Sequence, residues 1–303
     1  MRGWRKSFVR PRTGRRAESL RDLYIECTQQ ERELSCDYQS GYLSGGGIGD
    51  LTPFTGIRSG PGILSHARAI AGSELGNLGA RLESVLARTV DGEVDVAVAV
   101  SGGIDSWILA MMLKMMGHRV HGYLLVSGVP GYCERAQALR IAESVGIACE
   151  EIRVDGERFR EALPEFVALI ETPVYNLHPI SKLLLARELA KRGIKKIIGG
   201  DGADQVMRHD WDCDLLPITF SCFTAMGVEL VAPFLDDDVV AVCGRPDPDK
   251  APVRELARDL GLPSLPKRPT LFPGDEPRAC LTHTTQLLVD HLEAFRSCAA
   301  LRA

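Results

Sequence analysis

The turn at residues 101–106, which reads SGGIDS, brings together two glycines, two hydroxyls and a carboxylate. It follows a strand-like apolar run at 94–100 and precedes an amphipathic pattern typical of a helix. Backbone N–H groups gather at a helix N-terminus, and glycines let an anion approach them closely. A carboxylate beside that anion repels it unless a divalent cation bridges the two. The turn therefore predicts a nucleotide polyphosphate held with Mg²⁺, against the alternative of an ordinary turn capped by Asp105 or Ser106.

A second glycine-rich turn, GGDGADQ at 199–205, follows another short apolar run and contains Asp201 and Asp204. In a parallel sheet the carboxyl ends of the strands open on one edge. We therefore expect Asp105 and Asp204 to face one another across a bound polyphosphate and to share Mg²⁺. Taken alone, Gly-Asp-Gly is a common surface turn, and only the pairing with the first turn favours a metal site. A third segment, VAPFLDDD at 231–238, is typical of a loop and a helix start with Asp236 as the cap.

Strand and helix patterns alternate around these turns, which predicts an α/β fold with a doubly wound parallel sheet. Strands are expected at 94–100, 119–126, 149–154 and 195–198, and helices at 105–116, 134–145, 157–170 and 177–192. An amphipathic helix is expected at 73–90, with Leu75 on its apolar face. Residues 205–243 show no clear pattern, 244–277 are rich in proline and charge, and a last helix is expected at 280–297 in a helical C-terminal part.

The composition bounds the function. The chain has 303 residues, of which 45% are hydrophobic, and a net charge of −4. These values predict a sizeable core and argue against binding of nucleic acid or membrane by the whole surface. The nine cysteines form no CxxC pair, and no signal-type or membrane-spanning run occurs. We therefore expect a cytoplasmic protein with reduced cysteines. The stretch 1–16, whose charged residues are all basic, is expected to be a solvated arm, or else a contact for nucleic acid or an acidic partner.

Taken in order, these motifs make residues 90–275 resemble the synthetase domain of asparagine synthetases and β-lactam synthetases, which are PP-loop ATP pyrophosphatases with an adenine nucleotide α-hydrolase-like fold. The resemblance rests on SGGIDS at 101–106, Glu171-Thr172, GDGAD at 200–204 and PFLD at 233–236. It implies that a substrate carboxylate attacks the α-phosphate of ATP, giving an acyl-adenylate and pyrophosphate. An amine or ammonia then forms the amide and releases AMP.

The resemblance also implies roles for single residues. Asp201, Glu171 and Lys267 are the expected catalytic residues, and Asp105 and Asp204 the expected Mg²⁺ ligands. ATP contacts are expected from the phosphate turn, the second strand and the second turn: Ser101, Gly102, Gly103, Asp105, Ser106, Val126, Ser127 and Gly200. Two ordinary roles stay open, a helix-terminal salt bridge for Glu171 and a basic surface turn for Lys267.

The departures from the family concern the amino end and the substrate pocket. Residue 2 is Arg2, where the glutaminase domain of asparagine synthetases has its nucleophilic cysteine. We expect residues 1–65 to be a basic arm and irregular segment that keeps only the end of such a domain, and 66–303 to be the ligase domain. Val231 and Gln205 stand where the family has arginine and an acidic residue. These changes argue against aspartate as the substrate.

The expected partners are thus a small-molecule or peptide carboxylate and an amine or ammonia donor, in a stand-alone ligase or cyclase of natural-product metabolism. A homodimer is compatible with the sequence. Two other functions stay open. The basic arm and the cysteines suggest a PP-loop enzyme of sulfur transfer or tRNA modification. Trp107, directly after the phosphate turn, suggests with Val231 and Gln205 a catalytically dead binding homologue, although a packing role for Trp107 is favoured.

Overall fold

The computed structural model describes residues 69–127, 134–170, 178–208, 216–243, 247 and 249–263, together with three two-residue strands nearer the N-terminus. These are β1 (Phe8–Val9), β2 (Arg16–Ala17) and β3 (Arg58–Ser59), which pair antiparallel in the order β2-β1-β3. The helix expected at 280–297 lies outside the described residues. Within the described part, no helix is long and apolar enough to cross a bilayer.

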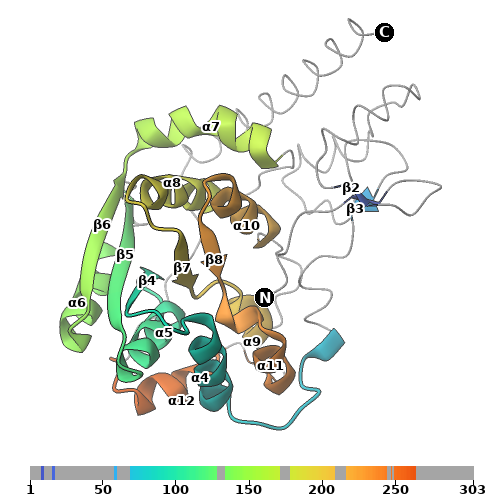
Figure 1. The fold of residues 1–303 in the computed structure, drawn as a ribbon, viewed down its shortest axis with the longest axis vertical. Coiled ribbons are helices and arrows are strands. Elements are labelled where there is room, and N and C mark those ends of the chain that lie inside the picture. The colour runs from blue at the N-terminus through green and yellow to red at the C-terminus, as the bar shows by residue number, and fades with distance from the viewer. Residues whose placement is uncertain are drawn as a thin grey trace, which may run out of the picture.

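The central sheet has five parallel strands in the part of the chain that is described (Figure 1). They are β4 (Asp95–Val100), β5 (Arg119–Ser127), β6 (Ala148–Val154), β7 (Lys196–Gly199) and β8 (Glu229–Val231), in the order β6-β5-β4-β7-β8. The chain runs from β4 outward to β6 and then returns to the other side of β4. The α/β doubly wound prediction is confirmed, and its switch point lies between β4 and β7.

Helices cover both faces of the sheet. One apolar core joins α4 (Leu78–Thr89), α5 (Ile104–Met115), α6 (Arg135–Val145), α11 (Asp237–Val242) and α12 (Ala251–Asp259) to one face. On the other face α8 (His178–Lys191) and α10 (Leu216–Ala225) pack against the strands, and α7 (Gly156–Ile170) packs on both helices (Figure 1). Two short elements follow the last two strands, α9 (Ala203–Arg208) after β7 and the 3₁₀ helix η1 (Pro233–Leu235) after β8.

One expected helix is corrected, and one helix was not expected. The helix expected from residue 73 begins at Leu78, because the Asn77 side chain accepts the N–H of Ala80 at 3.0 Å and caps it. Leu75 therefore precedes the helix and is fully exposed, so its assignment to the apolar face was wrong. No helix was predicted in the region 244–277, which is rich in proline and charge, yet it contains α12. This helix tolerates Pro252 in its first turn because that position needs no N–H partner.

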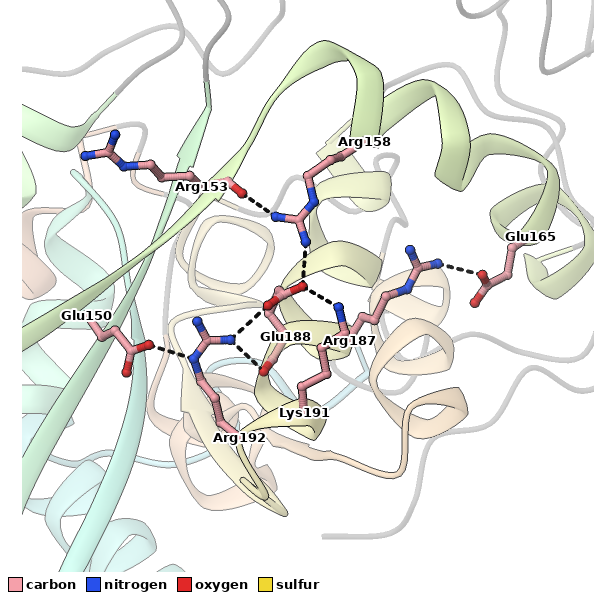
Figure 2. Close-up of polar contacts among 8 residues, drawn as sticks. All are labelled: Glu150, Arg153, Arg158, Glu165, Arg187, Glu188, Lys191 and Arg192. Atoms are coloured by element: carbon pink, nitrogen blue, oxygen red, sulfur yellow. Dashed lines mark hydrogen bonds and ion pairs between the residues drawn. The ribbon is translucent and has the colours of Figure 1, made fainter.

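A charged network attaches α7 to the rest of the domain (Figure 2). The Glu188 carboxylate on α8 accepts hydrogen bonds from Arg158 of α7 at 2.6 Å, Lys191 at 2.9 Å and Arg192 at 3.0 Å. Arg192 also binds Glu150 of β6 at 2.6 Å. Three cationic donors on one carboxylate, Lys191 foremost, lower the pKa of Glu188 to about 2 from an ordinary 4.5. This network thus joins α7, α8 and the edge strand.

We predict that Glu188→Gln lowers the free energy of unfolding and that the loss depends on pH. The pKa of Glu188 is depressed in the folded state, so its contribution is complete above about 4.5 and disappears as pH falls towards about 2. Urea unfolding of both proteins at a series of pH values measures the difference. Glu161→Gln, an exposed site on α7, is the control. A difference that stays constant from pH 7 to pH 3 contradicts the assignment.

Candidate functional site

The two glycine-rich turns lie in contact at the switch point of the sheet. Strands β4 and β7 run in register, with Ala99 opposite Gly199, and each turn begins where its strand ends. A Cβ on Gly200 would lie 2.8 Å from the backbone N of Ser106 and 3.1 Å from the Cβ of Asp105. Gly200 is therefore required because the second turn packs directly on the first turn of α5. Both turns open on one edge, as the parallel-sheet argument predicted.

The first turn is closed by its own hydroxyls. Ser101 donates its N–H to the Ser106 Oγ at 3.2 Å, and Gly103 donates its N–H to the Ser101 Oγ at 3.0 Å. The N-cap of α5 is Gly103, which makes no side-chain cap bond, so the expectation that Asp105 or Ser106 caps the helix is wrong. The hydroxyls hold the shape of the loop and leave Asp105 for other contacts.

Side chains from α5 and α6 support this turn. Trp107 is fully buried and donates its Nε1–H to the Ser101 carbonyl at 2.7 Å, so it packs beneath the loop as favoured above. Gln137 is buried and donates its amide to the Gly102 carbonyl at 2.6 Å. The Glu134 Oε2 accepts the N–H of Gly102 at 2.8 Å. We did not predict Gln137 or Glu134 as site residues, since no motif marks them and only the fold brings α6 to the loop.

The carboxylates of Asp105 and Asp204 converge on one cation, the ammonium of Lys250. The Lys250 Nζ lies 2.7 Å from the Asp105 Oδ2 and 2.9 Å from the Asp204 Oδ1, and its side chain is only 12% exposed. The other oxygen, the Asp105 Oδ1, is buried without a hydrogen-bond partner among the described residues. Burial raises the pKa of the Asp105 carboxyl, and Lys250 acts in the opposite direction.

The backbone that presents Lys250 is unusual. Its φ of +51° is the only left-handed value at a non-glycine position in the described residues. Both oxygens of Asp247 hold the loop, accepting the N–H groups of Asp249 at 2.8 Å and Ala251 at 2.9 Å. Sequence reasoning missed Lys250. One signal could have marked it. Lys250 lies just before the first turn of α12, where the helix dipole disfavours a cation, so a lysine there suggests a specific anionic partner.

The donor set fits Mg²⁺. The carboxylates of Asp105 and Asp204 already share one positive charge, and the Asp105 Oδ1 has no hydrogen-bond partner within the described part. Mg²⁺ prefers oxygen ligands and is often held by only one or two carboxylates. Within the described ranges, no group of three or more histidine, cysteine or acidic side chains is arranged so that it could hold a metal ion. Phosphate oxygens would supply the remaining ligands.

Asp201 lies apart from this pair. Its Oδ1 accepts a hydrogen bond at 2.7 Å from the Nζ of Lys182 on α8, and both side chains are about six-sevenths buried, at 14% and 15% exposed. Lys182 was not predicted, because its partner is set by packing across the sheet.

The remaining predicted residues divide into two groups. Val126 and Ser127 end β5, the neighbour of β4, and Val126 packs partly buried against the core. Glu171 and Lys267 lie outside the described residues. The third motif was expected to be a loop and forms η1, with Leu235 packed against Gly202 of the second turn. Asp236 caps α11 by accepting the N–H of Asp238, as predicted.

We predict that Gly200→Ala separates the two turns and lowers the free energy of unfolding by about 1–3 kcal/mol, the usual range for overpacking. It should also speed hydrogen exchange of the amides at 101–106. The control is Gly117→Ala, where a Cβ meets open space but φ is +93°, so only backbone strain of about 1 kcal/mol is expected. Unchanged exchange at 101–106 in Gly200→Ala would show that the close approach is dispensable.

The asparagine synthase family profile matches residues 77–208. A putative glutamine-hydrolysing asparagine synthetase of Mycobacterium tuberculosis H37Rv is 30% identical over 125 residues, covering 41% of this chain and 19% of that protein. Glutamine-hydrolysing asparagine synthetase B of Escherichia coli K12 is 25% identical over 199 residues, covering 52% and 35%. The chain thus spans between a fifth and about a third of these relatives.

Among solved structures, a predicted tRNA methyltransferase subunit of Methanocaldococcus jannaschii is similar with a TM-score of 0.35 and 19% identity, covering 64% of this chain and 87% of that one. So low a TM-score carries no argument about fold or function. The match to the family profile is more informative than this structural similarity. It includes both glycine-rich turns, in the order in which the motifs were expected. Residues 77–208 are therefore similar to the asparagine synthase family, and over this range the resemblance that the motifs predicted is confirmed.

Proposed function

We propose that this protein is an ATP-dependent amide-bond synthetase that forms AMP and pyrophosphate. It adenylates a small-molecule or peptide carboxylate and transfers the acyl group to an amine or ammonia, in specialised metabolism. The observation that carries the proposal is the convergence of Asp105 and Asp204 on one cation, beside the SGGIDS turn. Residues distant in the chain meet at the edge where doubly wound sheets bind ligands.

The turn at 101–106 is suited to hold the phosphates. It opens at the N-terminus of α5, where the helix dipole favours an anion, and the N–H of Gly102 already binds a carboxylate oxygen at 2.8 Å. Mg²⁺, held by Asp105 and Asp204, would neutralise the charge that develops on the departing pyrophosphate. Ser101 and Ser106 would orient that group with their hydroxyls. Val126 and Ser127, at the end of β5, are proposed neighbours of the adenine.

The acyl side of the site is proposed from the family resemblance. Asp201 would lie near the activated substrate, Lys267 would stabilise negative charge on the adenylate or the tetrahedral intermediate, and Glu171 occupies a position marked in the family. Val231 is buried on β8 and offers no charge where the family has arginine. This supports a carboxylate other than aspartate, with a linear or a cyclised product.

A sulfur-transfer function gains no support from the three cysteines in the described residues. A sulfur-carrying cysteine acts as a thiolate, which needs a low pKa and access to solvent. Burial raises the pKa of Cys149 to about 11 and that of Cys222 and Cys243 to about 12. These three thiols are therefore poor nucleophiles.

The direct test is carboxylate-dependent release of pyrophosphate from ATP and Mg²⁺, screened over amino acids, hydroxy acids and short peptides with an amine present. We expect release only with the matching acid, accompanied by equimolar AMP. Intact binding of ATP without pyrophosphate release for any acid in a broad screen would contradict the ligase and favour a binding homologue.

We predict that Asp105→Asn and Asp204→Asn each reduce turnover by at least about a hundredfold, the usual order for loss of a main electrostatic group, with little change in folding. Mg²⁺-dependent binding of ATP, followed by titration calorimetry, should weaken in both variants. Asp259→Asn, an exposed site on α12, removes the same charge and should leave both unchanged. Substantial residual turnover in either site variant would refute the metal assignment.

A further inference from the structure

Two side chains of the protein occupy the positions that the ligand's charges would take. The ammonium of Lys250 lies between the two carboxylates that fit Mg²⁺, at 2.7 and 2.9 Å. The carboxylate of Glu134 lies on the N–H of Gly102, in the turn that fits a phosphate, at 2.8 Å. A Cβ on Gly102 would meet the Glu134 Cβ at 2.8 Å, so Glu134 packs directly over the loop.

We propose that Glu134 and Lys250 are internal substitutes for the phosphate and the metal ion, and that both are displaced when a Mg²⁺-nucleotide binds. The inference rests on the proposed function and adds a competition within the same site. Glu134 and Lys250 thereby raise the concentration of Mg²⁺-nucleotide that is needed to fill the site.

The competition follows from the number of bonds available. Gly102 has one N–H, and a donor directed at the Glu134 oxygen cannot also bind a phosphate oxygen with good geometry. An ammonium at the Asp105 Oδ2 and Asp204 Oδ1 repels a divalent cation that binds the same two carboxylates, so Lys250 weakens metal binding while it stays there. Each ligand charge therefore competes with the side chain of like sign.

The arrangement also explains how a buried pair of carboxylates is compatible with a stable fold. The Asp105 carboxylate is buried near a second carboxylate, and an unpaired buried charge is costly. Lys250 compensates that charge, while its strained backbone is held by Asp247. Its long flexible side chain can leave without moving that backbone. A free cation can replace Lys250 but leaves Glu134 on the turn, and a free polyphosphate can replace Glu134 but leaves Lys250 between the carboxylates. A ligand that carries both charges can replace both side chains and is therefore favoured.

Each half of the competition can be measured without turnover. In Glu134→Gln we expect pyrophosphate, added without metal, to bind about tenfold more tightly than to the natural protein in calorimetry, since a charged hydrogen-bond competitor is lost. In Lys250→Met we expect Mn²⁺, added without nucleotide, to bind about tenfold more tightly by electron paramagnetic resonance. Glu143→Gln on α6 and Lys195→Met before β7 make the same charge changes at exposed sites and should stay within about twofold of the natural protein.

Stability gives an independent readout, since Lys250→Met leaves two carboxylates without their ammonium. Its Tm should rise on addition of Mn²⁺ by more than that of the natural protein. Unchanged or weaker binding of the free ion in either variant, with Mg²⁺-ATP still bound by the natural protein, overturns the paired competition and leaves the ligase intact. If the natural protein binds neither Mg²⁺-ATP nor the free ions, both the competition and the proposed function fail.

Discussion

The close approach of the Gly200 backbone to the first turn of α5 is the constraint on which the candidate site depends. At 2.8 Å from a hypothetical Cβ to the Ser106 N, no side chain is tolerated there without displacement. The contact places the end of β7 against the end of β4, and so places Asp204 within reach of the cation that Asp105 holds. The glycine at position 200 and the placement of the two carboxylates both follow from this contact.

Acidic side chains at this edge are held by lysines from other elements. Lys250, which precedes α12, forms ion pairs with Asp105 and Asp204, and Lys182 of α8 forms one with Asp201. Burial makes such pairing necessary, because a carboxylate out of water needs a hydrogen-bonded cation or a proton. Three aspartates face two ammonium groups here, and Glu134 adds a fourth carboxylate, so the formal charge at this edge stays negative. The two lysines come from opposite faces of the sheet, and the aspartates with which they pair belong to two adjacent turns.

The sequence predicted the strands that carry a run of apolar residues, together with the turns that follow β4 and β7. It also predicted the meeting of Asp105 and Asp204, because parallel strands end on one edge. It did not reveal β8, whose three residues are too few to show a period, or Lys250 and Glu134. Their roles come from long-range packing against loops that lie far away in the chain, and no local pattern records such a partner.

The register between β4 and β7 has a consequence for how the domain holds together. The strands β4, β5 and β6 form one consecutive half of the sheet, while β7 and β8 form another, and the backbone pairing between the halves runs only along Val98–Ile198 and Ala99–Gly199 within the described residues. A ligand that binds to both turns connects the two halves of the sheet across the β4–β7 pairing. Such a ligand would therefore slow the separation of the two halves by partial unfolding. Protection from proteolysis would then detect ligand binding even where the reaction is unknown.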